Sequence, residues 1–298
     1  TLEYISIRHG GFSITGVSGD EINGLTLGGI GRGTTINHIE IFANADDGIE
    51  WFGGTVHAHH LVSAFCGDDA FDWDTGFRGT GQFWFAVQAT DDAGRGGELD
   101  GFDSTTDENT EEFSDPVVAN ATLIGSGSNS GVGSNSPTLR IRNGGASEWY
   151  NSIFTAYPNT ALRIDADDSA DQRWKAGDIV IRNNVFFDYG AGSSIPAVVE
   201  GTSRDSTIKA DNVFMDPQLA GISRSRSGSL DPRPEASGLP TPEDKSSFEN
   251  TSATPRDNYV GVDLGPIENT DYLGAFAPNG DLWTTGWTKL STNGYMVQ

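Results

Sequence analysis

The chain has 298 residues, 42 of them acidic and 18 lysine or arginine, which gives a formal net charge of −24. So negative a chain repels nucleic acid and anionic membranes, and no apolar run approaches the roughly 18 residues of a membrane span. The 39 glycines and the absence of Lys- and Glu-rich amphipathic runs argue against a helical protein.

The first predicted element is a strand. Residues 2–7 alternate with the strand period, as do residues 139–141, and Gly, Asn, Asp or Ser residues bound both segments. We therefore predict an all-β chain. Because the chain opens on strand pattern without a polar cap, we expect residues 2–7 to contact another polypeptide. That partner is either upstream coils of the same protein or neighbouring subunits in a homo-oligomer or filament.

A short sequence phrase then occurs twice. Residues 46–51 carry two acids, a small residue, an apolar residue, an acid and a tryptophan, and residues 68–73 repeat them after 68 − 46 = 22 positions. Residues 139–141 and 162–164 repeat at a similar interval. A period of 20–25 residues indicates units that bury their apolar faces only by stacking. The short strands and Gly/Asp/Asn corners of each unit predict a right-handed parallel β-helix, with about 22 residues per coil.

The period disappears near residue 203. We therefore place the coils in residues 1–203 and an irregular tail, packed on the same domain, in residues 204–298. Residues 217–256 are rich in Ser, Pro and Gly, and we expect them along the outside of the solenoid. The end of the chain is aromatic between Tyr272 and Trp287, and we predict that it folds back as a cap on the last coil.

Several segments carry a family resemblance. They are residues 10–11, 22–29, 46–54 and 230–234. With them the chain resembles the C-terminal part of a family of secreted or surface-exposed bacterial right-handed β-helix proteins, most of which lack an assigned activity. The resemblance implies this fold, further coils upstream and an extracellular or bacterial cell-surface location. It favours a role as scaffold, adhesin or filament subunit.

The acidic pairs also resemble motifs of the polygalacturonases, β-helical enzymes that hydrolyse pectin. Asp47 lies where their Asn-Thr-Asp motif ends, and Asp68 and Asp69 match their Asp-Asp motif one coil later, since 68 − 47 = 21. Stacked coils about 4.8 Å apart would bring these carboxyls together as the acid and base of a glycosidase. The resemblance thus implies catalytic Asp47, Asp68 and Asp69, although Arg95 replaces the histidine of the Gly-His-Gly motif.

The same region also has the composition of a metal site. Six carboxylates crowd two adjacent coils, and no Lys or Arg lies between residues 40 and 74: Asp46, Asp47, Glu50, Asp68, Asp69 and Asp72. Carboxylates this close repel one another unless some are protonated or a cation lies among them. Oxygen ligands favour Ca²⁺. Alternatively, the acids are solvated corners, because Asp bonds its own backbone in turns.

Two further sets of side chains suit an acidic polysaccharide. Trp51, Trp73 and Trp84 lie on successive coils, where they either stack in the core or form an exposed ladder for sugar rings. Arg140 and Arg142 resemble the Arg-Ile-Lys motif of the polygalacturonases. Two functions therefore stay open. One is a calcium-stabilised surface protein, and the other is an enzyme acting on an acidic polysaccharide.

Overall fold

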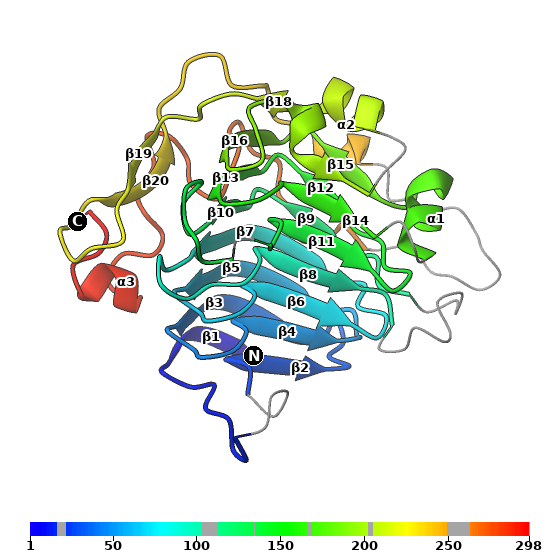
Figure 1. Cartoon of the computed structure of the whole chain (residues 1–298). Helices are drawn as coiled ribbons and strands as arrows, with labels where there is room; N and C mark the ends of the chain where they lie inside the picture. Colours follow the sequence, from blue (N-terminus) through cyan, green and yellow to red (C-terminus); the bar gives the residue numbers. More distant parts are fainter. Residues whose placement is uncertain are drawn as a thin grey trace.

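The structure, a computed structural model, describes residues 1–16, 22–102, 113–133, 135–165, 169–201, 205–248 and 263–297. Figure 1 shows a solenoid whose coils stack from the N-terminal strands at the bottom to the C-terminal strands at the top. Within the described residues, its walls are two parallel sheets, one of 11 strands and one of 7. The predicted all-β parallel β-helix is confirmed.

The larger sheet takes one long strand or two short strands from each coil. Its strands are β1 (Leu2–Arg8), β3 (Thr35–Phe42), β5 (His57–Ala64), β7 (Thr80–Val87), β9 (Val117–Ala119), β10 (Thr122–Ile124), β12 (Glu148–Tyr150), β13 (Ile153–Tyr157), β15 (Val180–Arg182), β16 (Val185–Tyr189) and β18 (Val213–Phe214). All pair in parallel with the equivalent strand of the next coil. The larger sheet thus follows the coils along the whole solenoid.

The coils bend this sheet at residues with a left-handed backbone. The φ angle is 55° at His38, 53° at His60 and 58° at Phe83, and the later coils bend at Asn120 and Asn151. Asparagine enters this region more easily than most residues, because its short side chain bonds locally. The bend leaves two consecutive side chains outside the core, so one strand forms two walls of the coil.

The smaller sheet contains β2 (Leu25–Gly28), β4 (Ile49–Phe52), β6 (Phe71–Asp74), β8 (Gly97–Asp100), β11 (Leu139–Arg142), β14 (Leu162–Ile164) and β17 (Val199–Glu200). Ile49 pairs with Phe71, and this step along the chain equals the predicted period. Phe71 then pairs with Gly97 after a longer step, because the turn between β7 and β8 is longer. The register is therefore set by pairing, while the turns absorb the differences in length.

The core between the sheets is aromatic. Trp51 stacks on Trp84 with ring centroids 5.1 Å apart, and Trp73 stacks on Trp149 at 6.0 Å. All four tryptophans are fully buried. The predicted sugar-binding ladder of Trp51, Trp73 and Trp84 is therefore wrong. The physical reason is strand alternation, since Trp51 follows an outward-facing Glu50 and must point inward.

Helices and a hairpin cover the C-terminal coils and one flank. They are α1 (Ser169–Ala176), η1 (Ile195–Ala197), α2 (Asp205–Asp211), β19 (Leu219–Ile222), β20 (Leu230–Pro234), η2 (Lys245–Ser247) and α3 (Lys289–Thr292). The parallel ladder continues to Phe214, beyond the boundary placed at residue 203. Ile208 of α2 is buried in the main core, so α2 covers the last coil.

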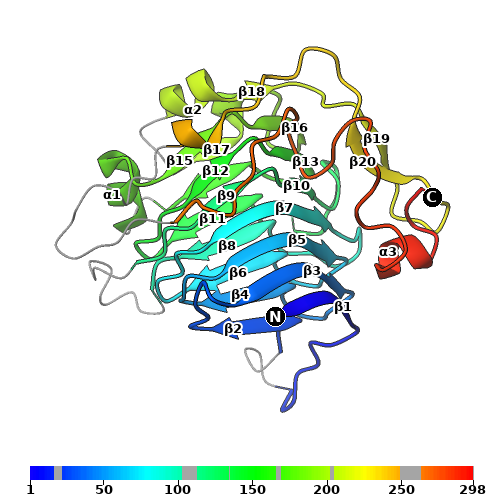
Figure 2. The same cartoon turned by 180° about the vertical axis from the view of Figure 1, so that it is seen from behind.

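The aromatic end of the chain does not cap that coil. Figure 2 shows residues 263–297 crossing the outer face of the larger sheet and returning toward β3. Gln82 and Glu268 exchange two hydrogen bonds of 2.8 and 2.9 Å, and Phe276 packs on Phe85 with centroids 5.1 Å apart. The predicted cap is therefore wrong in its position. These strands also carry outward apolar side chains, among them Phe42, Val62 and Phe85, and the tail buries them.

The first strands form the other edge of the solenoid. Tyr4, Phe12 and Ile14 are exposed there, while Leu2 and Ile7 are half-buried against the core. That residues 2–7 contact further coils or a second subunit stays a prediction. Among the described residues, no helix is long and apolar enough to cross a bilayer.

Candidate functional site

The acidic residues begin in the turn that leads from the larger sheet into the smaller one. Equivalent turns stack, with the Gly48 N–H bonded to the carbonyl of Asp69 at 2.8 Å. Side chains reinforce this stack. Oδ1 of Asp47 accepts the Asp69 N–H at 2.9 Å, and Oδ1 of Asp69 accepts the N–H of Arg95. Asp47 and Asp69 are 8% and 1% exposed, so both carboxylates hold the turns together.

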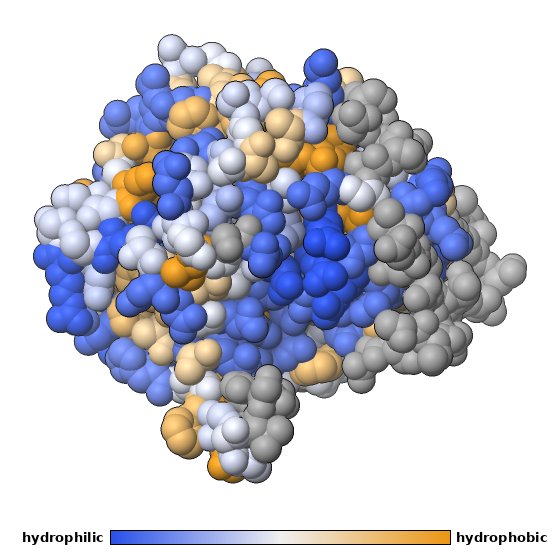
Figure 3. Space-filling view, in the orientation of Figure 1, coloured by the Kyte–Doolittle hydropathy of each residue, from blue (hydrophilic) through white to orange (hydrophobic). Residues whose placement is uncertain are grey.

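The strands after these turns carry an outward column of charges. Glu50 of β4 pairs with Asp72 of β6, and Asp72 pairs with Glu98 of β8. The same column continues as Arg140 of β11 and Arg163 of β14. The column therefore changes from acidic to basic between β8 and β11, and Glu200 of β17 follows Arg163. Figure 3 shows a hydrophilic surface over β6, β8 and β11.

Three overlapping groups of carboxylates form where the turns meet the column. In each group the ligand atoms lie within 4.8 Å of one another: Asp46, Asp47 and Asp68; Asp47, Glu50 and Asp72; Asp69, Asp72 and Glu98. The structure thus brings together all six residues predicted as metal ligands and adds Glu98. Repeating the step from Glu50 to Asp72 along the sequence reaches Gly94 and misses Glu98, because the next coil is longer.

Burial and mutual repulsion favour the protonated forms of these acids. Desolvation, followed by repulsion from Asp69, raises the pKa of Asp47 to about 9. Desolvation likewise raises the pKa of Glu50 and of Glu98 to about 7 and that of Asp72 well above its ordinary value. Such carboxylates are stabilised by protons or by a cation. A close, oxygen-only donor set fits Ca²⁺.

Arginines border the acidic groups on the C-terminal side. Nη1 of Arg95 lies 2.9 Å from both Asp69 Oδ2 and Glu98 Oε1. Arg142 lies 3.0 Å from Glu98, and Arg140 lies 3.7 Å from it. Arg140 and Arg142 are half-buried and therefore still reach the surface. From the sequence, Arg95 was considered only as the replacement for the motif histidine, and the structure places its guanidinium beside Asp69 and Glu98.

The three residues predicted to be catalytic are close but unequal. Asp68 is exposed, whereas Asp47 and Asp69 are buried and bonded to backbone N–H groups. A glycosidase needs two carboxyls that both reach the substrate. Solvent reaches the other members of the cluster, which are therefore better placed for that role than Asp47 or Asp69: Asp46, Glu50, Asp68, Asp72 and Glu98.

These features define the class of protein as a parallel β-helix with a two-signed charged face on its smaller sheet. The family model described as a pectate-lyase-like β-helix domain matches residues 1–222, and the chain belongs to that family. Comparison with curated proteins and with solved structures gave no match.

Proposed function

We propose that this protein is an extracellular or bacterial cell-surface β-helix that binds an acidic polysaccharide along the smaller sheet, with Ca²⁺ in the acidic half. The observation that carries the proposal is the outward column in which Glu50, Asp72 and Glu98 are followed by Arg140 and Arg163. Its rungs repeat about every 4.8 Å along the axis. An extended anionic chain lying along this column meets a charged group at each rung.

The two halves of the column would neutralise the polysaccharide in different ways. Arg140 of the column and Arg142 beside it carry guanidinium groups, which bond carboxylates in a planar, charge-assisted geometry. Within the protein they pair with Asp165 and Asp100, respectively. Asp46, Glu50, Asp68 and Asp72, with the buried Asp47 and Asp69 behind them, would hold the cation. Bound Ca²⁺ supplies positive charge that offsets the repulsion among these acids and attracts uronate groups.

Binding is tested by calorimetric titration with polygalacturonate and alginate, in Ca²⁺ and in EDTA, beside a neutral glucan. We expect binding of an acidic polymer that weakens in EDTA. The double variant Arg140→Ala/Arg142→Ala should lose roughly tenfold in affinity, equivalent to ~1.4 kcal/mol. Arg226→Ala is the control, because Arg226 is exposed on the tail. Equal affinity in the double variant and in the control would contradict the proposal.

Cleavage of the bound chain is a second candidate function. Desolvation raises the pKa of Glu50 to about 7, so this half-buried carboxyl is poised to act as a general acid at neutral pH. Release of reducing ends or unsaturated products from polygalacturonate tests it. Glu50→Gln should stop release, because its side chain cannot donate the proton. If the unaltered protein releases no product, its polysaccharide binding serves a scaffold, adhesin or filament role.

A further inference from the structure

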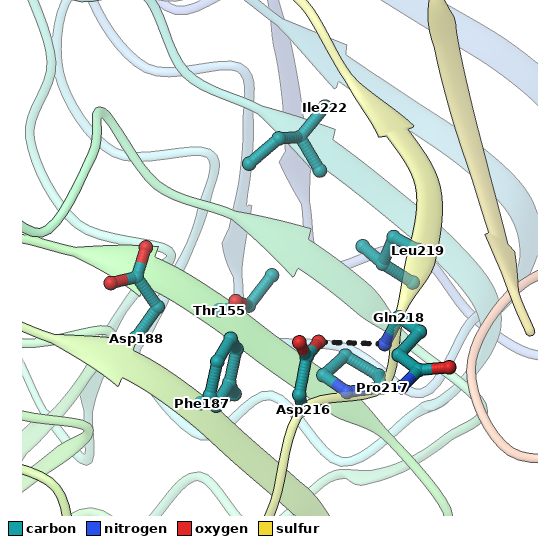
Figure 4. A pocket seen from close by; sticks show the side chains of 8 residues that line it. All are labelled: Thr155, Phe187, Asp188, Asp216, Pro217, Gln218, Leu219 and Ile222. Carbon is teal, nitrogen blue, oxygen red and sulfur yellow. Dashed lines mark hydrogen bonds between the residues drawn. The ribbon is translucent and has the colours of Figure 1, made fainter. Parts of the chain in front are cut away.

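A separate hollow lies on the larger sheet. Figure 4 shows it between β16 and β19, with Phe187, Asp188 and Asp216 on one side and Ile222 on the other. Its volume is about 320 Å³, and a second hollow of about 400 Å³ adjoins it through the shared Asp188 and Ile222. Ligand pockets typically measure about 300–1,000 Å³. The hollow is therefore large enough for a small ligand.

The floor of the hollow is an outward aromatic ring. Val87, Ile124, Thr155 and Phe187 form one column in register on the larger sheet. The first two are buried under the C-terminal tail. Phe187 is the last of these four residues, and its half-buried ring lines the hollow. The end of an otherwise covered apolar column thus lines the hollow.

Two carboxylates flank this ring. Asp188 has φ 57°, and Ala156, its equivalent in the preceding coil, has φ 61°. The left-handed backbone at this position therefore does not require an acidic side chain. Asp188 forms no side-chain hydrogen bond or ion pair with any residue that the structure describes. One oxygen of the exposed Asp216 accepts the Gln218 N–H at 2.7 Å. The carboxylates therefore offer acceptor atoms beside the ring.

The charge of the hollow restricts its ligand. Arg224 lines the adjoining hollow, and its Nε donates to the carbonyl of Gln88 at 2.7 Å. The guanidinium also donates to the carbonyl of Gly125, so backbone oxygens hold it. The hollow around Phe187 carries two acids and no base among its lining residues. An anionic ligand would be repelled there, whereas hydrogen-bond donors are favoured.

We propose that this hollow binds one saccharide unit that is neutral or carries an amine. The apolar face of the sugar ring would pack on Phe187, and its hydroxyls or ammonium group would donate to Asp188 and Asp216. The site goes beyond the proposed function, because it needs neither Ca²⁺ nor Arg140 and Arg142. The protein would then hold an acidic chain on one sheet and an uncharged or amino sugar on the other.

The test titrates xylotetraose, mannotetraose, chitosan tetraose and tetragalacturonate against the full chain. Calorimetry gives affinity, and the methyl NMR signals of Ile222 and Leu219 report on the hollow. We expect at least one of the neutral or amine tetraoses to bind and shift these signals, and tetragalacturonate to leave them unchanged. Binding of the amine alone would identify an amino sugar, and binding of a neutral tetraose would identify a hydroxyl-recognising site.

Variants make the assignment specific. Phe187→Ala should weaken binding roughly tenfold, equivalent to ~1.4 kcal/mol. Asp188→Asn should also weaken it, while asparagine retains the left-handed backbone. Phe12→Ala is the control, since Phe12 is 82% exposed at the other end of the solenoid. Arg140→Ala/Arg142→Ala should leave this binding intact, which separates the two proposals.

Two results would overturn the saccharide site. One is that no neutral or amine tetraose binds the unaltered protein. The other is that binding persists unchanged in both Phe187→Ala and Asp188→Asn. If Phe187→Ala does not fold, Ile222→Trp replaces it, because Ile222 is 38% exposed and a larger ring there fills the hollow. Retained affinity in Ile222→Trp, with unshifted methyl signals in the unaltered protein, would equally count against the site.

Discussion

The carboxylate of Glu40 accepts the backbone N–H of Leu290 at 3.1 Å, although the two residues lie far apart in the sequence. Its other oxygen accepts the N–H of Lys289 at 2.6 Å and the hydroxyl of Ser6. Glu40 is fully buried, and the two N–H groups open α3, where a helix has no partners of its own. One side chain of the second long strand thus anchors the end of the tail.

Replacing Glu40 should loosen that end. Glu40→Ala leaves two buried N–H groups without their acceptor, at a cost of about 1–3 kcal/mol for each unsatisfied group. We expect a lower melting temperature and faster proteolysis of the tail, with a smaller effect in Glu40→Gln, which keeps one acceptor oxygen. Glu3→Ala is the control, since Glu3 is exposed. A tail as resistant in Glu40→Ala as in the control would mean that this carboxylate does not anchor it.

The acidic cluster should make stability depend on pH. Burial raises the pKa of Asp47 to about 9 and that of Glu50 and Glu98 to about 7, against ordinary values of 3.8 and 4.5. The native state then binds more protons than the unfolded state, and stability falls as pH rises. His59 and His60, with pKa lowered by burial to about 4 and 3, act oppositely but only below about 6.5.

Between pH 6.5 and 9, therefore, only the carboxyls among these groups contribute to the pH dependence of stability. We expect the melting temperature in EDTA to fall across this range and Ca²⁺ to restore it. The gain from Ca²⁺ should be larger at pH 8.5 than at pH 6.5, because the metal needs deprotonated ligands and stabilises by mass action. Sodium chloride at matched ionic strength controls for screening. Identical melting curves in Ca²⁺ and EDTA at pH 8.5 would remove the metal proposal.

A single substitution separates repulsion from metal binding. Asp72 belongs to two of the three carboxylate groups. Asp72→Asn replaces a buried acid by a side chain that cannot ionise, so in EDTA at pH 8.5 we expect a higher melting temperature, by about 2–4 °C for each kcal/mol. In the same variant, Ca²⁺ should raise the melting temperature much less than it does in the unaltered protein. Asp91→Asn is the matched control, because Asp91 is exposed. A variant that gains as much from Ca²⁺ as the unaltered protein would place the metal elsewhere.

The stacking of the coils can be predicted from the sequence, because strands that pair in register place similar residues one period apart. Glu50 and Asp72 occupy equivalent rungs, and the step between them is the period that the sequence repeats. The same step along the sequence does not reach Glu98, because the turn that precedes its strand is longer. Turns lie outside the ladder, so their lengths vary at little cost to pairing. The acidic cluster was therefore predictable for two coils and not for the third.

The alternation of charged and apolar residues along a strand predicts which side chains point inward, and the spacing of one residue type does not. Trp51 follows the charged Glu50, so the pair already indicates an inward tryptophan. The bends are harder to foresee, because His60 takes φ 53° and lies outside the core beside His59. A strict two-residue alternation places these histidines on opposite faces. The path of the tail depends on which outer face is apolar, and this follows only after the bends are known.

The buried tryptophans provide the last prediction. Trp84 stacks on Trp51 with ring planes 7° apart, and its Nε1–H donates to the carbonyl of Ala58 at 2.9 Å. Trp84→Ala should cost about 3–5 kcal/mol, because it removes a fully buried ring and leaves a cavity.

Denaturant unfolding measures this loss, with Trp84→Phe as the milder change and Trp287→Ala as a control at the half-buried surface. The folded fraction of Trp84→Ala should bind acidic polysaccharide as the unaltered protein does, since the ring faces the core. Weakened binding by a fully folded Trp84→Ala protein would contradict this assignment and would indicate that Trp84 lies on the binding face.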